Sequence, residues 1–301
     1  MPTHVAIAGA TGNLGPTILN ALLSASHRVT VLTRHGSTST SKLQSHPSLT
    51  IKQVDFASTT SIIPALAGVD VVVSSVAGDA IGFQNPLIDA AVAAGVSRFI
   101  PAEYGLDSAN EKAILLPIIA EKYATQKHLH KKVEESGGKF SWTAIAVGWF
   151  LDWILQETDY VLDVKGRSAT LFNGGDVKFS STLLKDIAQA VVGVIEKREE
   201  TKNRVVYVHS AVVTQKQLIG YVKEKDGKEW KTKVLGTKEL LAELSEAAVK
   251  GDFDAIGRLT PVIGTSDPEY GCDYTGYEDN KLLGIEEMSE SDLRKLMEEL
   301  M

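Results

Sequence analysis

Short apolar runs alternate with amphipathic stretches along the first half of the chain. The stretches have helical periodicity at Pro16–Ala25, Ser61–Leu66, Pro86–Ala94 and Ile118–Ser136. The apolar runs predict strands at His4–Ala8, Arg28–Thr33, Thr50–Asp55, Val69–Val76, Arg98–Pro101 and Trp142–Val147. Strands that are apolar on both faces are typical of buried parallel sheets. The alternation therefore predicts an α/β fold, with a doubly wound parallel sheet covered by helices on both faces.

The second half of the chain has a different pattern, which predicts a smaller, mixed α/β region. Its predicted elements are a hairpin of Ser168–Phe172 and Asp176–Ser180, a helix at Leu184–Glu196, a strand at Asn203–His209, helical stretches up to Arg258, an irregular segment at Gly264–Asp279 and a helix at Ser289–Met301. We expect the strand at 203–209 to rejoin the main sheet. The boundary between the two regions is predicted near residue 155, which gives domains of 1–155 and 156–301.

Composition and charge exclude several classes of protein. The 301 residues are 44% hydrophobic and 23% charged, as is ordinary for a globular chain. A formal charge of −7 argues against binding to nucleic acid. The single cysteine, Cys272, excludes an internal disulfide and a thiolate zinc site, and no metal is expected. No run is long and apolar enough for a membrane span and no secretory signal is visible, so we expect a cytoplasmic monomer or homodimer.

A glycine-rich turn joins the first predicted strand to the first predicted helix. It reads Gly9-Ala10-Thr11-Gly12-Asn13-Leu14-Gly15, a G-x-x-G-x-x-G pattern. Gly9 permits a tight exit from the strand, Gly12 lets the backbone approach a pyrophosphate, and Gly15 lets the helix lie close to the sheet. Between a strand and a helix of an alternating chain, this pattern predicts a dinucleotide site in a Rossmann-type fold.

The end of the second strand predicts which dinucleotide binds. Proteins of this fold that prefer NAD carry an acidic residue about 20 residues beyond the turn, where it grips the ribose diol. This chain has no Asp or Glu before Asp55, and Thr33-Arg34 stands at that position. A guanidinium suits a phosphate, so we predict NADP(H), with Arg34 and Lys42 on the 2′-phosphate.

Further cofactor contacts are predicted where the next strands end. Asp55 and Phe56 close the third strand, where the adenine is expected to lie. Ser75, Val76 and Ala77 close the fourth strand, beneath the adenosine ribose.

Candidate catalytic residues occur on the helix that follows the fifth strand. Tyr123 and Lys127 are four residues apart, so they share one helix face. A cation beside a phenol lowers the pKa of that phenol, which favours Tyr123 as a proton donor and places Lys127 near the nicotinamide ribose. After the sixth strand, the aromatic residues Trp149, Phe150 and Trp153 are candidate walls of an apolar substrate pocket, although aromatic residues at such a position are equally typical of core.

These motifs together resemble the NmrA-like and isoflavone-reductase-like branch of the atypical short-chain dehydrogenases/reductases. The resemblance rests on GATGNLG at Gly9–Gly15, LTR at Leu32–Arg34, RFIPAEYG at Arg98–Gly105, FSSTLLKDIAQAVV at Phe179–Val192 and DNKLLG at Asp279–Gly284. It implies that Arg34 binds the NADPH 2′-phosphate and that Lys127 acts at the nicotinamide end. Ala102 stands where plant members commonly have serine, so a Ser–Tyr–Lys triad is not expected.

The resemblance implies one leading function and one alternative. The leading hypothesis is an NADPH-dependent oxidoreductase that reduces a small aromatic metabolite, similar to an isoflavonoid or phenylpropanoid, by hydride transfer. The alternative is a non-catalytic NADP(H)-binding regulator that senses the redox state.

Overall fold

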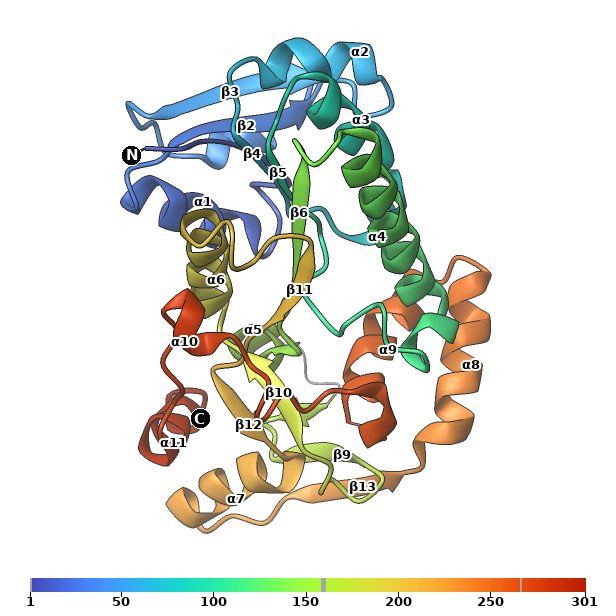
Figure 1. The fold of residues 1–301 in the computed structure, drawn as a ribbon. Coiled ribbons are helices and arrows are strands. Elements are labelled where there is room, and N and C mark those ends of the chain that lie inside the picture. The colour runs from blue at the N-terminus through green and yellow to red at the C-terminus, as the bar shows by residue number, and fades with distance from the viewer. Residues whose placement is uncertain (1, 158–160, 266) are drawn as a thin grey trace.

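A seven-stranded parallel sheet forms the centre of the computed structural model, which describes residues 2–157, 161–265 and 267–301 (Figure 1). The strand order is β11-β6-β5-β4-β1-β2-β3, and every neighbouring pair is parallel. The bounds of its strands are β1 His4–Ala8, β2 Arg28–Arg34, β3 Leu49–Val54, β4 Val71–Ser74, β5 Arg98–Ile100, β6 Ser141–Ala146 and β11 Arg204–Tyr207. The predicted doubly wound α/β fold is therefore confirmed.

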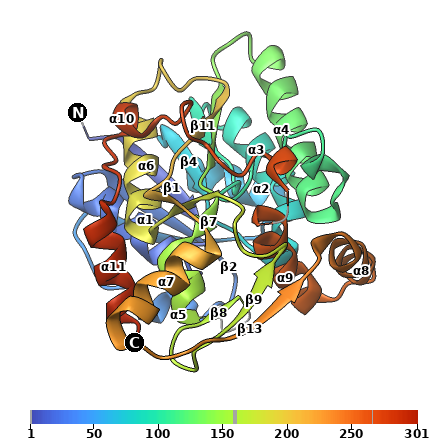
Figure 2. The ribbon, with the colours of Figure 1, turned by 90° about the horizontal axis from the view of Figure 1, so that it is seen from below.

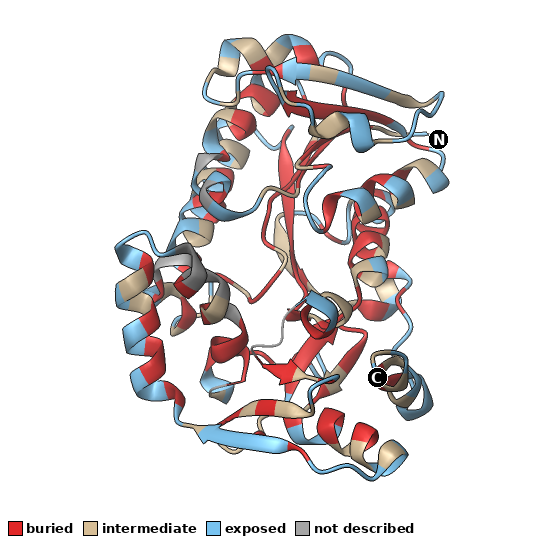
Figure 3. Ribbon diagram, turned by 180° about the vertical axis from the view of Figure 1, so that it is seen from behind, coloured by how far each residue is buried: buried red, intermediate tan, exposed pale blue. Residues whose placement is uncertain are grey.

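Helices cover both faces of this sheet because the crossovers are right-handed and the direction of strand addition reverses after β3. The helices α1 (Gly15–Ser24) and α6 (Leu184–Glu196) pack together on one face, where they share an apolar core with β1 and β6. The other face is covered by α2 (Thr59–Ile62), α3 (Asn85–Ala93) and α4 (Pro117–Glu135), as Figure 1 shows. The inner strands β1, β4, β5 and β6 are almost entirely buried, whereas the edge strand β3 is largely exposed (Figure 3).

The second half of the chain builds two three-stranded sheets below the main one. One has the order β12-β10-β7 and the other β13-β9-β8. Their strands are β7 Trp149–Phe150, β8 Leu162–Asp163, β9 Ser168–Phe172, β10 Phe179–Thr182, β12 Ala211–Val213 and β13 Lys231–Leu235. The segment around residues 203–209, as β11, lies instead at the edge of the main sheet beside β6.

The predicted hairpin between Ser168 and Ser180 is wrong. The two strands lie in different sheets, since β9 pairs with β8 and β13 whereas β10 pairs with β7 and β12. Asn173, Gly174 and Gly175 all have positive φ. This three-residue left-handed turn directs the chain away from β9, so that β10 joins the other sheet. The strand β13 also differs from the prediction, since it lies in a stretch that we expected to be helical. Its sequence, KTKVL, does not alternate between apolar and polar residues, so the pattern gave no indication of a strand.

The remaining helices complete the lower half of the molecule. Their bounds are α5 Leu151–Glu157, α7 Gln215–Asp226, α8 Thr237–Val249, α9 Phe253–Gly264, α10 Asn280–Leu283 and α11 Glu290–Glu299. The C-terminal α11 packs against α7 (Figure 2) and begins with a capping box between Ser289 and Asp292. Among the described residues, no helix combines the length and the apolar character that crossing a membrane requires.

Candidate active site

A cavity of about 880 Å³ opens along the carboxyl edge of the main sheet. Its lining comes from the loops and turns that follow β1, β2, β3, β4 and β5, together with Lys122 on α4 and Phe150 in β7. Ligands of open α/β sheets bind at this edge, where the strand order reverses. The reversal here lies between β1 and β4, because the chain runs outward from β1 in both directions.

The three glycines of the first turn have different surroundings. A Cβ on Gly9, whose φ is 85°, would lie 2.5 Å from the Ser75 carbonyl oxygen. A Cβ on Gly15 would lie 2.1 Å from the Gly9 carbonyl oxygen. Both glycines therefore allow close packing of backbone against backbone. A Cβ on Gly12 would meet only the Gly9 carbonyl oxygen at 3.5 Å. Gly12 thus lines open space before the N-terminus of α1, which suits an approaching phosphate.

Several hydroxyl groups follow Arg34 along the chain and line the same end of the cavity. Ser37, Ser39 and Thr40 line the cavity with it. The Ser37 and Ser39 hydroxyl oxygens are 2.8 Å apart, and the Thr11 hydroxyl donates to the Ser39 hydroxyl oxygen at 3.2 Å. A guanidinium beside a row of hydroxyl donors is suited to a phosphate group. The sequence reasoning missed these hydroxyls, because the loop of residues 35–46 has no regular pattern.

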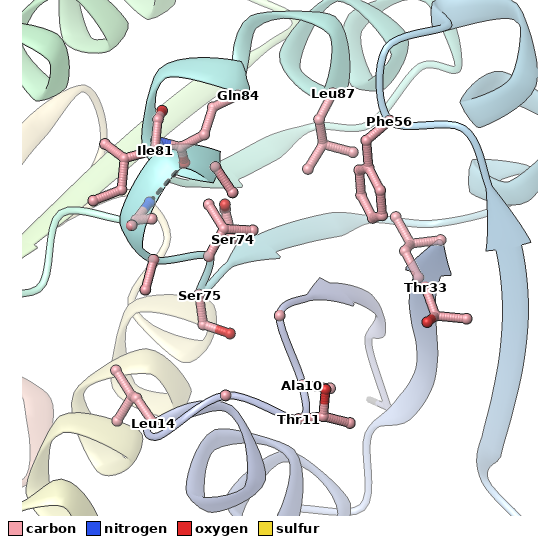
Figure 4. A pocket seen from close by; sticks show the side chains of 18 of the residues that line it. Ala10, Thr11, Leu14, Thr33, Phe56, Ser74, Ser75, Ile81, Gln84 and Leu87 are labelled. Atoms are coloured by element: carbon pink, nitrogen blue, oxygen red, sulfur yellow. Dashed lines mark hydrogen bonds between the residues drawn. The ribbon is translucent and has the colours of Figure 1, made fainter. Parts of the chain in front are cut away.

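Many of the residues predicted to bind the cofactor line this cavity, and four do not. Figure 4 shows Ala10, Thr11 and Leu14 on one side of the space and Ser74, Ser75 and Ile81 on the other. The predicted residues in the lining are Gly9, Thr11, Gly12, Asn13, Leu14, Thr33, Arg34, Phe56, Ser75, Val76 and Ala77.

The predicted cofactor residues outside the lining are Gly15, Lys42, Asp55 and, on α4, Lys127. The backbone of the glycine turn covers Gly15. Lys42 is exposed at the end of a short 3-10 helix, Ser39–Lys42. The Asp55 carboxylate accepts a hydrogen bond from the Ala57 backbone N–H at 2.9 Å, so it stabilises its own turn.

The lysine of α4 that lines the cavity is Lys122 and not the predicted Lys127. Lys127 is exposed, and its Nζ lies 4.8 Å from the ring centroid of Tyr123, which is also outside the lining. The two predicted residues do share a helix face, but they lie together outside the cavity. Lys122 lies three residues from the buried Ile119 and seven from the buried Leu129. This helical spacing places Lys122 beside the face of α4 that turns toward the core, but the spacing alone does not show that this face meets the cavity.

Burial controls the charge of Lys122 and of its neighbour Glu103. The Lys122 ammonium donates a hydrogen bond to the Glu103 carbonyl oxygen. Burial lowers the pKa of Lys122, and the charge of Glu103 partly opposes this shift. Burial also raises the pKa of the Glu103 carboxyl, which accepts a hydrogen bond from the Ser108 backbone N–H at 3.2 Å. Lys122 is therefore an amine able to give up a proton closer to neutral pH than a surface lysine.

Of the three aromatic residues predicted to wall a substrate pocket, Phe150 alone is in the cavity lining. Trp149 is 1% exposed and packs against Phe179, with ring centroids 4.2 Å apart. Trp153 packs against the core of the lower half. The prediction for these two tryptophans as pocket walls is not supported by their positions, because the ends of β6 and β7 turn them into the core.

The predicted irregular segment packs beside the site, and none of its described residues, 264–265 and 267–279, lines the cavity. The Tyr274 hydroxyl donates to the Gly105 carbonyl oxygen at 3.2 Å, directly after β5. Lys112 forms ion pairs with Asp267 and Glu269 in the same segment, each at 2.7 Å. The segment thus fixes the loop that carries Glu103, although the described lining of the cavity extends no further along the chain than Phe150.

Comparisons with known proteins identify relatives over the full length of the chain. The profile of the NmrA-like family matches residues 1–300. The chain is 32% identical over 290 residues to oxidoreductase aprR of Aspergillus flavus, and the match covers 95% of each chain.

Solved structures with the same fold include two reductase complexes. The structure described as AtPrR2 with NADP+ and (+)-pinoresinol is 20% identical and has a TM-score of 0.75, covering 100% of this chain and 99% of that one. The leucoanthocyanidin reductase–NADPH complex of Vitis vinifera is 21% identical and has a TM-score of 0.74, covering 99% of each chain.

Proposed function

This chain belongs to the NmrA-like family, and we propose that it is an NADPH-dependent oxidoreductase that reduces a small aromatic metabolite. One observation carries the proposal: a single cavity is lined by Arg34 and the hydroxyl groups of the following loop at one end, and by Lys122 at the other end. Its relatives include a protein named as an oxidoreductase, and its structural neighbours include reductases bound to NADP+ or NADPH.

The residues along the cavity fit NADP(H) by their shape and their chemistry. Gly12 has open space where a side chain would stand, and the first turn of α1 carries no acidic residue that would repel a pyrophosphate. Arg34, Ser37 and Ser39 would hold the 2′-phosphate, and Phe56 would lie against the adenine. The buried Ser74 hydroxyl has no hydrogen-bond partner and lines the same cavity, so it is available to a ribose hydroxyl.

Lys122 supplies the proton in this proposal. Bound NADPH provides a hydride to the substrate, and the reduced substrate then needs a proton on the neighbouring atom. The Lys122 ammonium donates it, while the Glu103 carbonyl oxygen holds the Nζ in place. Because burial lowers the pKa of Lys122, the amine releases this proton more readily than an exposed lysine would.

An aromatic substrate is favoured by the reductases with the same fold and by Phe150, which lines the cavity together with Lys122. The ring of Phe150 offers an apolar face on which an aromatic substrate could stack. The proposal therefore assigns the lower end of the cavity, between Lys122 and Phe150, to the substrate.

The two lysines of α4 allow a sharp test of this proposal. NADPH oxidation is followed at 340 nm with a panel of aromatic enones and lignan-like compounds. We expect Lys122→Met to lower kcat by about 10²–10⁴-fold while NADPH binding and the melting temperature are retained. The matched control Lys127→Met should keep kcat within about threefold of the original protein, because its charge is exposed and outside the cavity.

Two results would overturn the assignment. A large loss of turnover in the Lys127 variant, with none in the Lys122 variant, would return the role to Lys127. Tight NADPH binding without turnover of any compound would favour the alternative, a redox-sensing regulator, over an enzyme.

A further inference from the structure

A second cavity, of about 110 Å³, lies at the opposite edge of the main sheet from the nucleotide cavity. Arg98 begins β5, Ser141 begins β6, and Arg198 follows α6, so this cavity lies at the amino ends of the strands. Its full lining is Ser97, Arg98, Gly138, Lys139, Ser141, Arg198, Glu199 and Lys202. This lining contains four cationic side chains and one carboxylate, in a chain whose formal net charge is −7.

Arg98 forms the floor of this cavity and is 2% exposed. Its guanidinium donates to the hydroxyl oxygens of Ser141 at 2.8 Å, Thr143 at 2.7 Å and Thr201 at 3.1 Å, and also to the Arg198 carbonyl oxygen at 2.5 Å. These acceptors are all neutral, so they fix the direction of the guanidinium without cancelling its charge. Burial, and then the charge of Arg198, lower the pKa of Arg98 to about 10, and the charge of Glu199 partly opposes this shift.

Carboxylates compensate little of this charge. Within the described parts of the chain, Arg98, Lys139 and Arg198 have no carboxylate oxygen within 4.0 Å, and Lys202 meets Glu199 at 3.8 Å. A buried charge is costly unless it is paired. A small anion between these side chains would relieve the repulsion and gain charge-assisted hydrogen bonds from Arg198 and Lys139.

We propose that this cavity, here called the amino-edge site, binds a phosphate dianion. The volume suits one tetrahedral group and is too small for a nucleotide, which the cavity of about 880 Å³ accommodates instead. A guanidinium with a fixed orientation and two flexible cations at the rim provide the donors that phosphate oxygens require. The site joins the starts of β5 and β6 and the end of α6, so its occupation would stabilise the contact of these two strands with that helix.

The test measures binding of inorganic phosphate to the full-length protein by isothermal calorimetry and thermal unfolding. The variant Lys139→Gln/Arg198→Gln removes two rim charges; both side chains are partly or fully exposed, so the fold should be retained. We expect at least about a tenfold increase in the phosphate Kd in this variant. Arg34→Glu is the control for binding in the nucleotide cavity, and it should leave at least one phosphate site with its original affinity.

A second ligand distinguishes free phosphate from a phosphate ester. Phenyl phosphate that binds as tightly as inorganic phosphate would identify a phosphomonoester as the natural ligand, and binding of inorganic phosphate alone would identify the free ion. The proposal is overturned if chloride at matched ionic strength stabilises the protein equally, or if phosphate affinity is unchanged in the double variant. Loss of phosphate binding in Arg34→Glu alone would also overturn it, since that result assigns the phosphate to the nucleotide cavity.

Discussion

Replacing Arg34 by glutamate tests how this chain selects its cofactor. Losing a hydrogen bond to a charged group costs about 1.5–3 kcal/mol. The new carboxylate would also repel the 2′-phosphate, and at the exposed end of β2 this adds about 1–2 kcal/mol. Together these effects weaken NADPH binding by about 2.5–5 kcal/mol, which corresponds to roughly a 70-fold to 5,000-fold increase in Kd.

The assay is a fluorescence titration with NADPH and with NADH on the same protein samples. NADH lacks the 2′-phosphate, so its Kd should change by no more than about threefold. Lys42→Glu is the matched control, because it makes the same change of charge eight residues further along the chain, at a side chain outside the cavity lining. We expect it to change both dissociation constants by similar, small factors.

Raising the salt concentration adds an internal check on this reasoning. The difference between the original protein and Arg34→Glu should shrink at high ionic strength, because the charges are exposed to solvent. The reasoning is refuted if Arg34→Glu weakens NADPH and NADH equally, or if the Lys42 variant loses as much NADPH affinity as the Arg34 variant.

Three further predictions follow from the surroundings of individual residues. Gly15→Ala should lower the free energy of unfolding by about 1–3 kcal/mol, because the new Cβ would overlap the Gly9 carbonyl group. Gly12→Ala should keep the melting temperature but raise the Kd for NADPH at least about tenfold. Equal melting temperatures for the two variants would contradict this prediction. The alkaline limb of the pH profile of kcat/KM should lie below pH 10.5, because burial lowers the pKa of Lys122 and activity is lost as this amine deprotonates. If the limb is unchanged in Lys122→Arg, then a group other than Lys122 causes it. Burial raises the pKa of Cys272 to about 12, so at pH 8 a thiol reagent should modify the native protein about a thousandfold more slowly than the unfolded chain; rapid labelling of the native protein would show that the thiol is accessible.

The nucleotide end of the cavity could be predicted from the sequence because its signals are local. The glycine turn, Pro16 and Arg34 all lie within one strand–helix–strand unit, whose geometry is set by backbone preferences over about 30 residues. The bounds of α6 were predicted correctly for a similar reason, since its apolar face has a regular helical period over Leu184–Glu196.

The reacting end could not be predicted in the same way. A spacing of four residues shows that Tyr123 and Lys127 share a face of α4, but it does not show which face meets the cavity. That depends on the packing of the whole helix, in which Ile119 and Leu129 turn toward the core and bring Lys122 with them. The same limit applies to Trp149, because an aromatic core and an aromatic pocket have the same pattern in sequence.

The sequence by itself determined the order of strands and helices in the first half of the chain, the glycine turn and the cation that ends the second strand. Each of these depends on neighbouring residues and on the period of a single element. The tertiary structure alone decided which lysine faces the cavity, which sheet receives the strand after Gly175, and how Arg98, Lys139 and Arg198 come to surround one small space. These arrangements join residues up to about a hundred positions apart, and burial in the assembled core, rather than local spacing, fixes their orientation.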